Sequence, residues 1–258
     1  KISPFLLTNL KGSSAPNIVE IPSDDFTNSI PLALLIKSQG ETLIKPLQFV
    51  ESDLYCNDLD KKPPRYIFTL KMESWTVSLG WLLTMEKTKP FHTKSIFKLQ
   101  EELLGEEKTK SKKIRENDTS IILKSKDLES IIDKESGNLV KLYYKGENIV
   151  DFPAKLEFYE HKPYRESAWN LMKNWWDHPI NDLIKSVKVS IISQGPVQWR
   201  IRSSYIIGEN THAFVDYIYN MGVPGLGIEI GLDYHEIETL LKYKIPLKKK
   251  KKKTVAET

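Results

Sequence analysis

The sequence has one cysteine, no apolar run of membrane-spanning length and no signal-peptide pattern at its start. A single cysteine, Cys56, cannot form an internal disulfide, and this favours a reducing compartment. A transmembrane helix needs about 20 consecutive apolar residues, so none is predicted. We therefore expect a cytoplasmic protein that has no membrane partner.

The sequence motifs of common catalytic sites are also missing. There is no His-Glu-x-x-His, no phosphate-binding glycine loop, no nucleophile elbow and no Cys-x-x-Cys. The five histidines are scattered, and no two are spaced by two or four residues. Isolated histidines are mostly surface residues or satisfied core residues. We therefore expect no catalytic group, metal or cofactor within this sequence.

The net charge of +4 originates at one end of the chain. Residues 248–258 hold six lysines and one glutamate, a net of +5, so the remaining residues carry −1. A lysine run can neither pair nor pack, and we expect a disordered tail at 248–258. Because the rest of the chain has no basic excess, we expect no nucleic-acid partner. Salt-dependent binding of nucleic acid through the tail stays as a further alternative.

Residues 1–87 predict a small β-sandwich domain. Hydrophobic residues make up 40% of the 258 residues and charged residues 28%, as in globular proteins. Short runs of β-branched and aromatic residues alternate with turn-forming residues in this part of the chain. The runs are Ile18–Ile21, Pro31–Lys37, Glu41–Val50, Arg65–Met72 and Trp75–Met85. Pro46 interrupts the third run and indicates a sheet edge or a bulge.

Residues 88–115 differ in composition from the rest. Ile96, Leu99 and Leu103 lie at helical spacing and predict a short amphipathic helix. Nine of the 15 residues at 101–115 are charged, which is typical of a solvated linker. We place the domain boundary in this linker.

Residues 116–247 predict a second, larger β-sandwich. A hairpin is expected around residues 133–138, where Gly137 allows a positive φ. Later strands alternate strictly: Val197, Trp199 and Ile201 share one face, and Gln198, Arg200 and Arg202 share the other. This alternation predicts a sheet with one solvent-exposed side, and the glycine-containing turns at 195–196, 208–210 and 222–225 predict a meander. The fold class is therefore all-β, with two consecutive antiparallel β-sandwich domains.

An aromatic loop follows the strand at Lys155–Tyr159. Three of the six tryptophans, at positions 169, 175 and 176, fall within eight residues. Aromatic faces stack on the C–H faces of sugars, while carboxylates and arginines bind sugar hydroxyls. The candidate sugar-binding residues of this loop are Tyr164, Arg165, Glu166 and Trp169.

The structural alternative is that the tryptophans only pin the loop to the sheet. Packing is the preferred interpretation for Trp175 and Trp176. For Trp169, which is flanked by Ser167 and Asn170, both interpretations stay open. The pair His235-Glu236 ends a clean strand pattern, and its structural alternative is a strand-end ion pair.

Several short motifs, in order, resemble the C-terminal β-domains of family 38 glycoside hydrolases, the α-mannosidases. The motifs are Leu7–Asn9, Leu79–Trp81, Arg115–Asn117 with Gly137–Leu142, Lys155–Tyr159 with Ser167–Leu171, Gly195–Val197 with Arg200–Arg202, and Asp233–Glu236 with Leu240–Leu247. The sequence departs from the family at Ser167, where the family has Asp, at Tyr234, where it has Trp, and in the charged insertion at 101–115. The resemblance implies that the second sandwich is of the galactose-mutarotase type and is incomplete here.

The resemblance also implies a retaining α-mannosidase, with an aspartate nucleophile, a second carboxylate as acid/base, and zinc. In the family these groups lie in a preceding catalytic domain, so none is carried over to this sequence. Since the first residue is Lys1, we expect a piece of a longer polypeptide. His235 and Glu236 then join the four loop residues as candidate substrate-binding residues.

The expected function is to support a catalytic domain and to line its pocket for mannose-containing carbohydrate. The expected partners are that catalytic domain and the carbohydrate, and the resemblance also allows a homo-oligomer. The alternative is a stand-alone, non-catalytic carbohydrate-binding β-sandwich. Binding of mannosides by the chain alone would distinguish the alternative from mere structural support.

Overall fold

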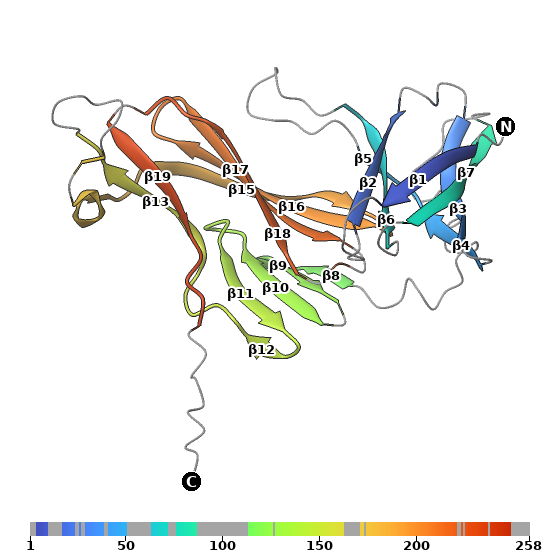
Figure 1. Ribbon diagram of the computed structural model, residues 1–258. Helices are drawn as coiled ribbons and strands as arrows, with labels where there is room; N and C mark the ends of the chain where they lie inside the picture. Colours follow the sequence, from blue (N-terminus) through green and yellow to red (C-terminus); the bar gives the residue numbers. More distant parts are fainter. Residues whose placement is uncertain are drawn as a thin grey trace, which may run out of the picture. The chain divides into compact units, whose positions relative to one another are not determined.

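The computed structural model describes most of the strand-forming sequence. The described residues are 4–9, 17–23, 26, 29–38, 41–50, 63–71, 76–86, 113–125, 127–162, 171–172, 174–220, 223, 225–236 and 238–248. The named elements among them are β-strands and the 3-10 turn η4 (Trp175–Asp177), and all strand pairs with a defined register are antiparallel (Figure 1). This confirms the all-β fold class. In this part of the chain, no helix is long and apolar enough to cross a membrane.

The strands are β1 (Pro4–Asn9), β2 (Asn17–Pro22), β3 (Ser29–Ser38), β4 (Glu41–Pro46), β5 (Gln48–Val50), β6 (Arg65–Leu70), β7 (Thr76–Glu86), β8 (Lys113–Glu116), β9 (Ser120–Lys124), β10 (Leu128–Asp133), β11 (Leu139–Tyr144), β12 (Glu147–Asn148), β13 (Lys155–Glu160), β14 (Pro179–Ile180), β15 (Ile184–Gln194), β16 (Gln198–Ile207), β17 (Thr211–Asn220), β18 (Gly227–Asp233) and β19 (Thr239–Lys244).

The chain divides into two compact units. The first comprises Lys1–Ser111, Ser190–Arg202 and Ala213–Asp233, and the second comprises Lys112–Val189, Ser203–His212 and Tyr234–Thr258. Most of the linker predicted at 88–115, and nearly all of the lysine tail, lie outside the described residues. The predicted boundary, the helix and the disordered tail therefore stay predictions.

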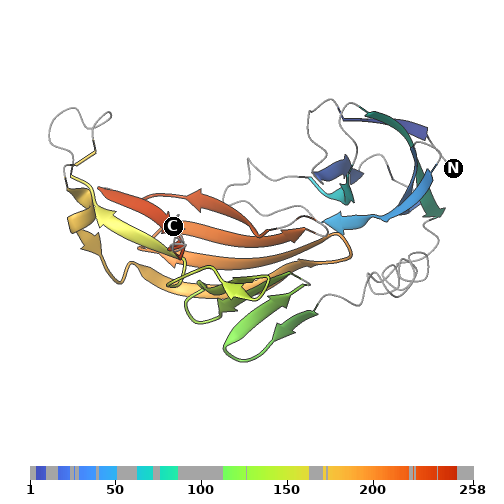
Figure 2. The same ribbon diagram turned by 60° about the horizontal axis from the view of Figure 1, so that its bottom comes forward.

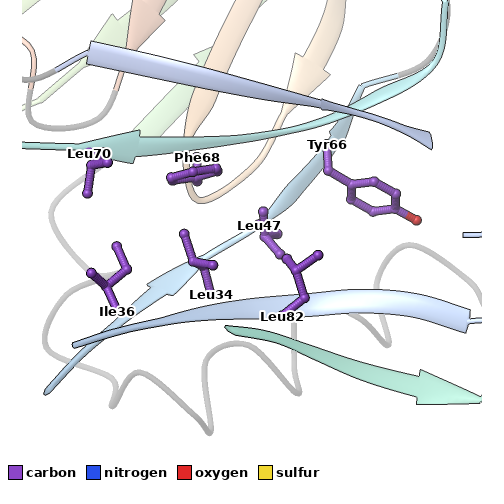
Figure 3. Close-up of a cluster of buried hydrophobic side chains, with 7 residues drawn as sticks. All are labelled: Leu34, Ile36, Leu47, Tyr66, Phe68, Leu70 and Leu82. Atoms are coloured by element: carbon purple, nitrogen blue, oxygen red, sulfur yellow. The ribbon is translucent and has the colours of Figure 1, made fainter. Parts of the chain in front are cut away.

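The first unit contains a β-sandwich. Its two sheets have the strand orders β1-β7-β3-β4 and β2-β6-β5. Phe68 and Leu70 of β6 face Leu34 and Ile36 of β3 in the core between the sheets (Figure 3). The strand predicted at Glu41–Val50 is divided after Pro46 into β4 and β5, each at the edge of its sheet. An edge accepts proline because no partner strand needs its missing N–H.

The middle strand of the smaller sheet is buried on both faces. Ile67 of β6 points away from the sandwich core and packs with Val50 and with Val197, next to β16. The buried amide of Gln48 joins the same regions: its Nε2 donates to the Gln198 carbonyl (2.8 Å), and its Oε1 accepts from the Gln198 N–H (2.6 Å). This side chain imitates the hydrogen bonding of a neighbouring strand.

The second unit contains a five-stranded sheet, with the order β12-β11-β10-β9-β8, and a three-stranded sheet, with the order β14-β13-β19. The β10–β11 hairpin confirms the predicted turn, in which Gly137 has a φ of +70°. The Gly137 carbonyl accepts hydrogen bonds from Ser203 Oγ (2.8 Å) and Tyr205 Oη (2.9 Å). A Cβ at position 137 would lie 2.6 Å from the Tyr205 hydroxyl, so the close approach also requires glycine.

The long strands form the predicted meander, in the order β15-β16-β17-β18 (Figure 2). The prediction of one solvent-exposed side is wrong for β16. Arg200 and Arg202 are only 2% and 7% exposed, because they pair with buried Asp216 of β17 instead of facing water. Alternation of polar and apolar residues shows which side chains share a face, but it does not show whether the polar face is wet.

Candidate functional site

The structure describes two of the six predicted site residues. Tyr164, Arg165, Glu166 and Trp169 lie outside the described residues, so their role stays a prediction. His235 and Glu236 are described, and they follow β18 in the short connection to β19. We call residues 234–236 together with residue 238 the corner.

Both ends of the aromatic loop are fixed by His161. Its backbone N–H donates to the Glu238 carbonyl (2.6 Å), and its ring Nδ1 accepts from the Met172 N–H (3.3 Å). The adjoining strand β13 pairs with β19, with Glu160 opposite Thr239 (Figure 2). The structure therefore places the base of the loop (His161 and Met172) beside the corner, two regions that are more than 60 residues apart in sequence.

The corner rests on the turn between β16 and β17. The His235 N–H donates to the hydroxyl of buried Thr211 (2.9 Å). The Glu236 carboxylate lies against Gly208, where an added Cβ would be 2.0 Å from its Oε1. Tyr234 Oη donates to the Thr239 carbonyl (3.0 Å), and burial raises the pKa of Tyr234. The backbone of the corner is therefore held from two sides.

The Glu236 carboxylate forms no ion pair or hydrogen bond with another side chain of the described residues, whereas neighbouring His235 has a further interaction of its own. The strand-end ion pair considered from the sequence therefore stays a prediction. Glu236 is half-buried, and His235 beside it is exposed. A carboxylate in this setting accepts hydrogen bonds from hydroxyl groups. The corner thus offers groups that suit a sugar.

A second polar cluster lies on β13 and β19. Tyr159 Oη donates to Glu157 (2.7 Å), and Lys244 approaches the same carboxylate at 3.4 Å. Burial of Glu157 opposes its ionisation, but the hydrogen bonds from Tyr159 and Lys244 and the charges of Lys244 and Lys155 outweigh burial and lower the pKa of Glu157. The hydrogen bond to Glu157, together with burial, raises the pKa of Tyr159.

Three aromatic rings, which we call the aromatic cluster, lead outward from this point. Tyr159 contacts Trp175 edge-to-face, with ring centroids 4.9 Å apart, and Trp175 contacts Trp176 in the same way at 5.9 Å. Lys242 lies over the rings of Tyr159 and Trp175. The packing role preferred for Trp175 is confirmed. For Trp176 it is wrong, because this side chain is 57% exposed.

A cavity of about 770 Å³ opens beside β13. Its walls come from the β10–β11 turn, β13, and the segment from β14 into β15. The two aromatic residues in its lining, Phe158 and Tyr159, are 5% and 8% exposed, so neither offers a free ring face. The cavity therefore lacks the stacking surface that is typical of a sugar site.

Sequence reasoning missed an arginine cluster in the first unit, formed by Arg200, Arg202, Asp216 and Glu229. Asp216, which is fully buried, accepts from Arg200 Nε (2.6 Å) and Arg202 Nε (2.7 Å). Arg200 also bonds Glu229 (2.9 Å), and the Arg202 guanidinium stacks 3.8 Å from the centre of the Phe214 ring. Two arginines at alternate positions of one strand were the available signal. Because the charges neutralise one another, we interpret this cluster as structural.

The described residues contain no cluster of side chains that could bind the zinc implied by the family resemblance. No three His, Cys, Asp or Glu side chains in that part of the chain converge to hold a metal ion. We therefore assign no step of a reaction to a metal held by these residues.

Comparison with known families matches residues 123–258 to the C-terminal domain of the glycosyl hydrolases of family 38. The match covers more than half of the 258 residues and includes both the loop base and the corner. A comparison with curated proteins finds none that matches the chain.

Proposed function

The chain belongs to glycosyl hydrolase family 38, whose C-terminal domain it contains, and we propose that it is the β-sandwich part of an α-mannosidase-like hydrolase. In this proposal the chain supports a catalytic domain and contributes the corner, with the adjoining aromatic loop, to the wall of the sugar pocket. The nucleophile, the acid/base and zinc belong to the catalytic domain. The substrate is a terminal α-mannoside.

The observation that carries this proposal is the contact between the loop base and the corner. Both segments bear the residue types that recognise sugars, and His161 connects them through two hydrogen bonds. A support domain that had only a packing role would not need a half-buried carboxylate held against a glycine turn. Binding sites are characteristically formed by loops that a rigid sheet positions, as here by β13 and β19.

The test is the hydrolysis of an aryl α-mannoside by the natural gene product, purified from its source cell. The proposal predicts hydrolysis, which a zinc chelator abolishes and added zinc restores. An aryl β-mannoside serves as the control substrate and should not be cleaved. Its leaving group lies on the opposite face of the sugar ring, so a nucleophile and an acid placed for an α-mannoside would each be on the wrong face.

The alternative is a stand-alone carbohydrate-binding module. It predicts no hydrolysis by the natural gene product, combined with binding of mannosides by the chain alone. The exposed ring of Trp176 is the observation that favours keeping this alternative, because it does not depend on a catalytic domain.

A further inference from the structure

Trp176 is the exposed end of a set of ring contacts that starts at buried Tyr159 and passes through half-buried Trp175. Tyr159 is 8% exposed, whereas Trp176, two ring contacts further on, is 57% exposed. An indole combines a large apolar face with a polar N–H, so an exposed indole on a turn whose backbone is held in place is a candidate contact for a ligand.

The turn that carries Trp176 is fixed by its backbone. The Trp175 N–H donates to the Met172 carbonyl (3.3 Å), the Asp177 N–H to the Asn174 carbonyl (3.0 Å), and the His178 N–H to the Trp175 carbonyl (3.1 Å). Asn174 precedes the turn in the left-handed conformation, with φ 60°, which asparagine tolerates better than most residues.

Both sides of the turn are also tied to the sheet. The Glu160 N–H donates to the His178 carbonyl (2.9 Å), and Pro179 and Ile180 then pair with β13 as β14. On the side of the rings, Trp175 packs on Tyr159. Little conformational entropy is therefore lost when a ligand binds to Trp176, because the turn that carries it is already held in place.

Polar residues occupy the turn that carries the exposed ring. Asn174, Asp177 and His178 are close to Trp176 in sequence, and all three are exposed. An amide, a carboxylate and an imidazole can bind hydroxyl groups, while the indole face covers one face of a sugar ring. A single exposed ring on a polar turn matches the size and chemistry of a pyranose better than the larger apolar surface of a protein partner.

We propose that Trp176 is a stacking platform for a pyranose ring of a glycan, with Asn174, Asp177 and His178 as hydrogen-bonding partners for its hydroxyls. The platform is separate from the corner residues His235 and Glu236. The inference rests on the proposed carbohydrate function. It adds a second position of sugar contact besides the corner, and this position does not require a catalytic domain.

The test is saturation-transfer NMR titration of the 258-residue chain with methyl α-mannoside and with α-mannobiose. The proposal predicts binding that Trp176→Ala weakens by about tenfold or more, which corresponds to about 1.4 kcal/mol. The matched control is Phe152→Ala, which removes a ring that is 69% exposed and should bind as the unchanged chain does. Leu171→Ala, which removes an apolar side chain that is 63% exposed, is compared with Trp176→Ala for self-association. Circular dichroism verifies that each variant is folded.

Three outcomes would overturn the inference. The first is binding that Trp176→Ala leaves unchanged, and the second is a chain that binds neither sugar. The third is loss of self-association, measured by sedimentation, on both Trp176→Ala and Leu171→Ala, which would make this surface an apolar contact between copies. None of these outcomes decides the hydrolase proposal, because that depends on aryl α-mannoside cleavage by the natural gene product.

Discussion

The arginine cluster of the first unit and the aromatic cluster of the second unit both start from a buried side chain of a strand, but only the aromatic cluster continues to a side chain that is exposed to solvent. In the arginine cluster, Arg200 and Asp216 are 2% and 0% exposed, and the charges meet inside the protein. In the aromatic cluster, buried Tyr159 leads through Trp175 to exposed Trp176.

The difference separates support from recognition. A closed set of charges has no group left for a ligand, and its removal is expected to cost stability alone. A set of contacts that runs from the core to solvent holds an exposed group in place, so its outer member is expected to matter for binding more than for folding. Substitutions in the two clusters should therefore have opposite profiles.

The largest effect is expected for Asp216→Asn. The change leaves two buried arginines without their shared carboxylate, and removing one partner of a buried ion pair costs about 3–5 kcal/mol. Urea unfolding measures the loss. Asp151→Asn is the matched control, because Asp151 is exposed and should tolerate the change within about 0.5 kcal/mol. Equal stability of the two variants would contradict the structural role of the cluster.

The next effect is expected for Gln48→Glu in the first unit. A carboxylate cannot donate the bonds that Gln48 Nε2 makes to Ser193 Oγ (2.6 Å) and to the Gln198 carbonyl (2.8 Å). Burying it against that carbonyl should cost about 2–3 kcal/mol. The same substitution at exposed Gln194 should be nearly neutral. If urea denaturation found the two variants equally stable, the strand-like role of the Gln48 amide would be wrong.

A smaller, pH-dependent effect is expected for Glu157→Gln in the second unit. The pKa of Glu157 is lower in the folded chain than its ordinary 4.5, so its ionised form stabilises the fold above that value, and the contribution disappears as the pH falls through the folded pKa. The variant should be less stable by about 1–2 kcal/mol at pH 7 and should approach the unchanged chain in acid.

Unfolding free energies measured between pH 7 and pH 3 provide the check. Glu147→Gln, at an exposed position, should show no such convergence. A Glu157→Gln deficit that stays constant with pH would mean that the carboxylate is not stabilised by Tyr159 and Lys244.

The smallest effect on stability is expected within the aromatic cluster itself. Trp176→Ala should change the free energy of unfolding by less than about 0.5 kcal/mol, as is usual for exposed positions. Trp175→Ala should cost about 1–2 kcal/mol more, since its ring contacts Tyr159, Trp176 and Lys242. Thermal unfolding of both variants tests this order. The reverse order would contradict the view that Trp175 anchors the turn while Trp176 is free to contact a ligand.

The strands could be predicted because their signals are local. The runs at Ile18–Ile21 and Pro31–Lys37 lie within β2 and β3, and Gly137 takes the positive φ that the hairpin needs. Turn residues and period-2 patterns depend on near neighbours, which the sequence displays directly.

Burial and the partners of the site could not be predicted in the same way. Arg200 and Arg202 are separated from Asp216 by 16 and 14 positions, and nothing in the alternation shows that a carboxylate faces them. The connection of His161 to Glu238 spans 77 positions and depends on a backbone bond. The sequence located the corner as a candidate, but only the pairing of β13 with β19 places it beside the loop.

The measurement that tests the central claim most directly is the steady-state kinetics of Glu236→Gln in the natural gene product, with an aryl α-mannoside as substrate. The account predicts that KM rises about tenfold while kcat changes little, because a charge-assisted hydrogen bond to the sugar is lost. Glu147→Gln, exposed and distant in sequence, should leave both constants unchanged. Unaltered KM and kcat in Glu236→Gln would contradict a contribution of the corner to the sugar pocket.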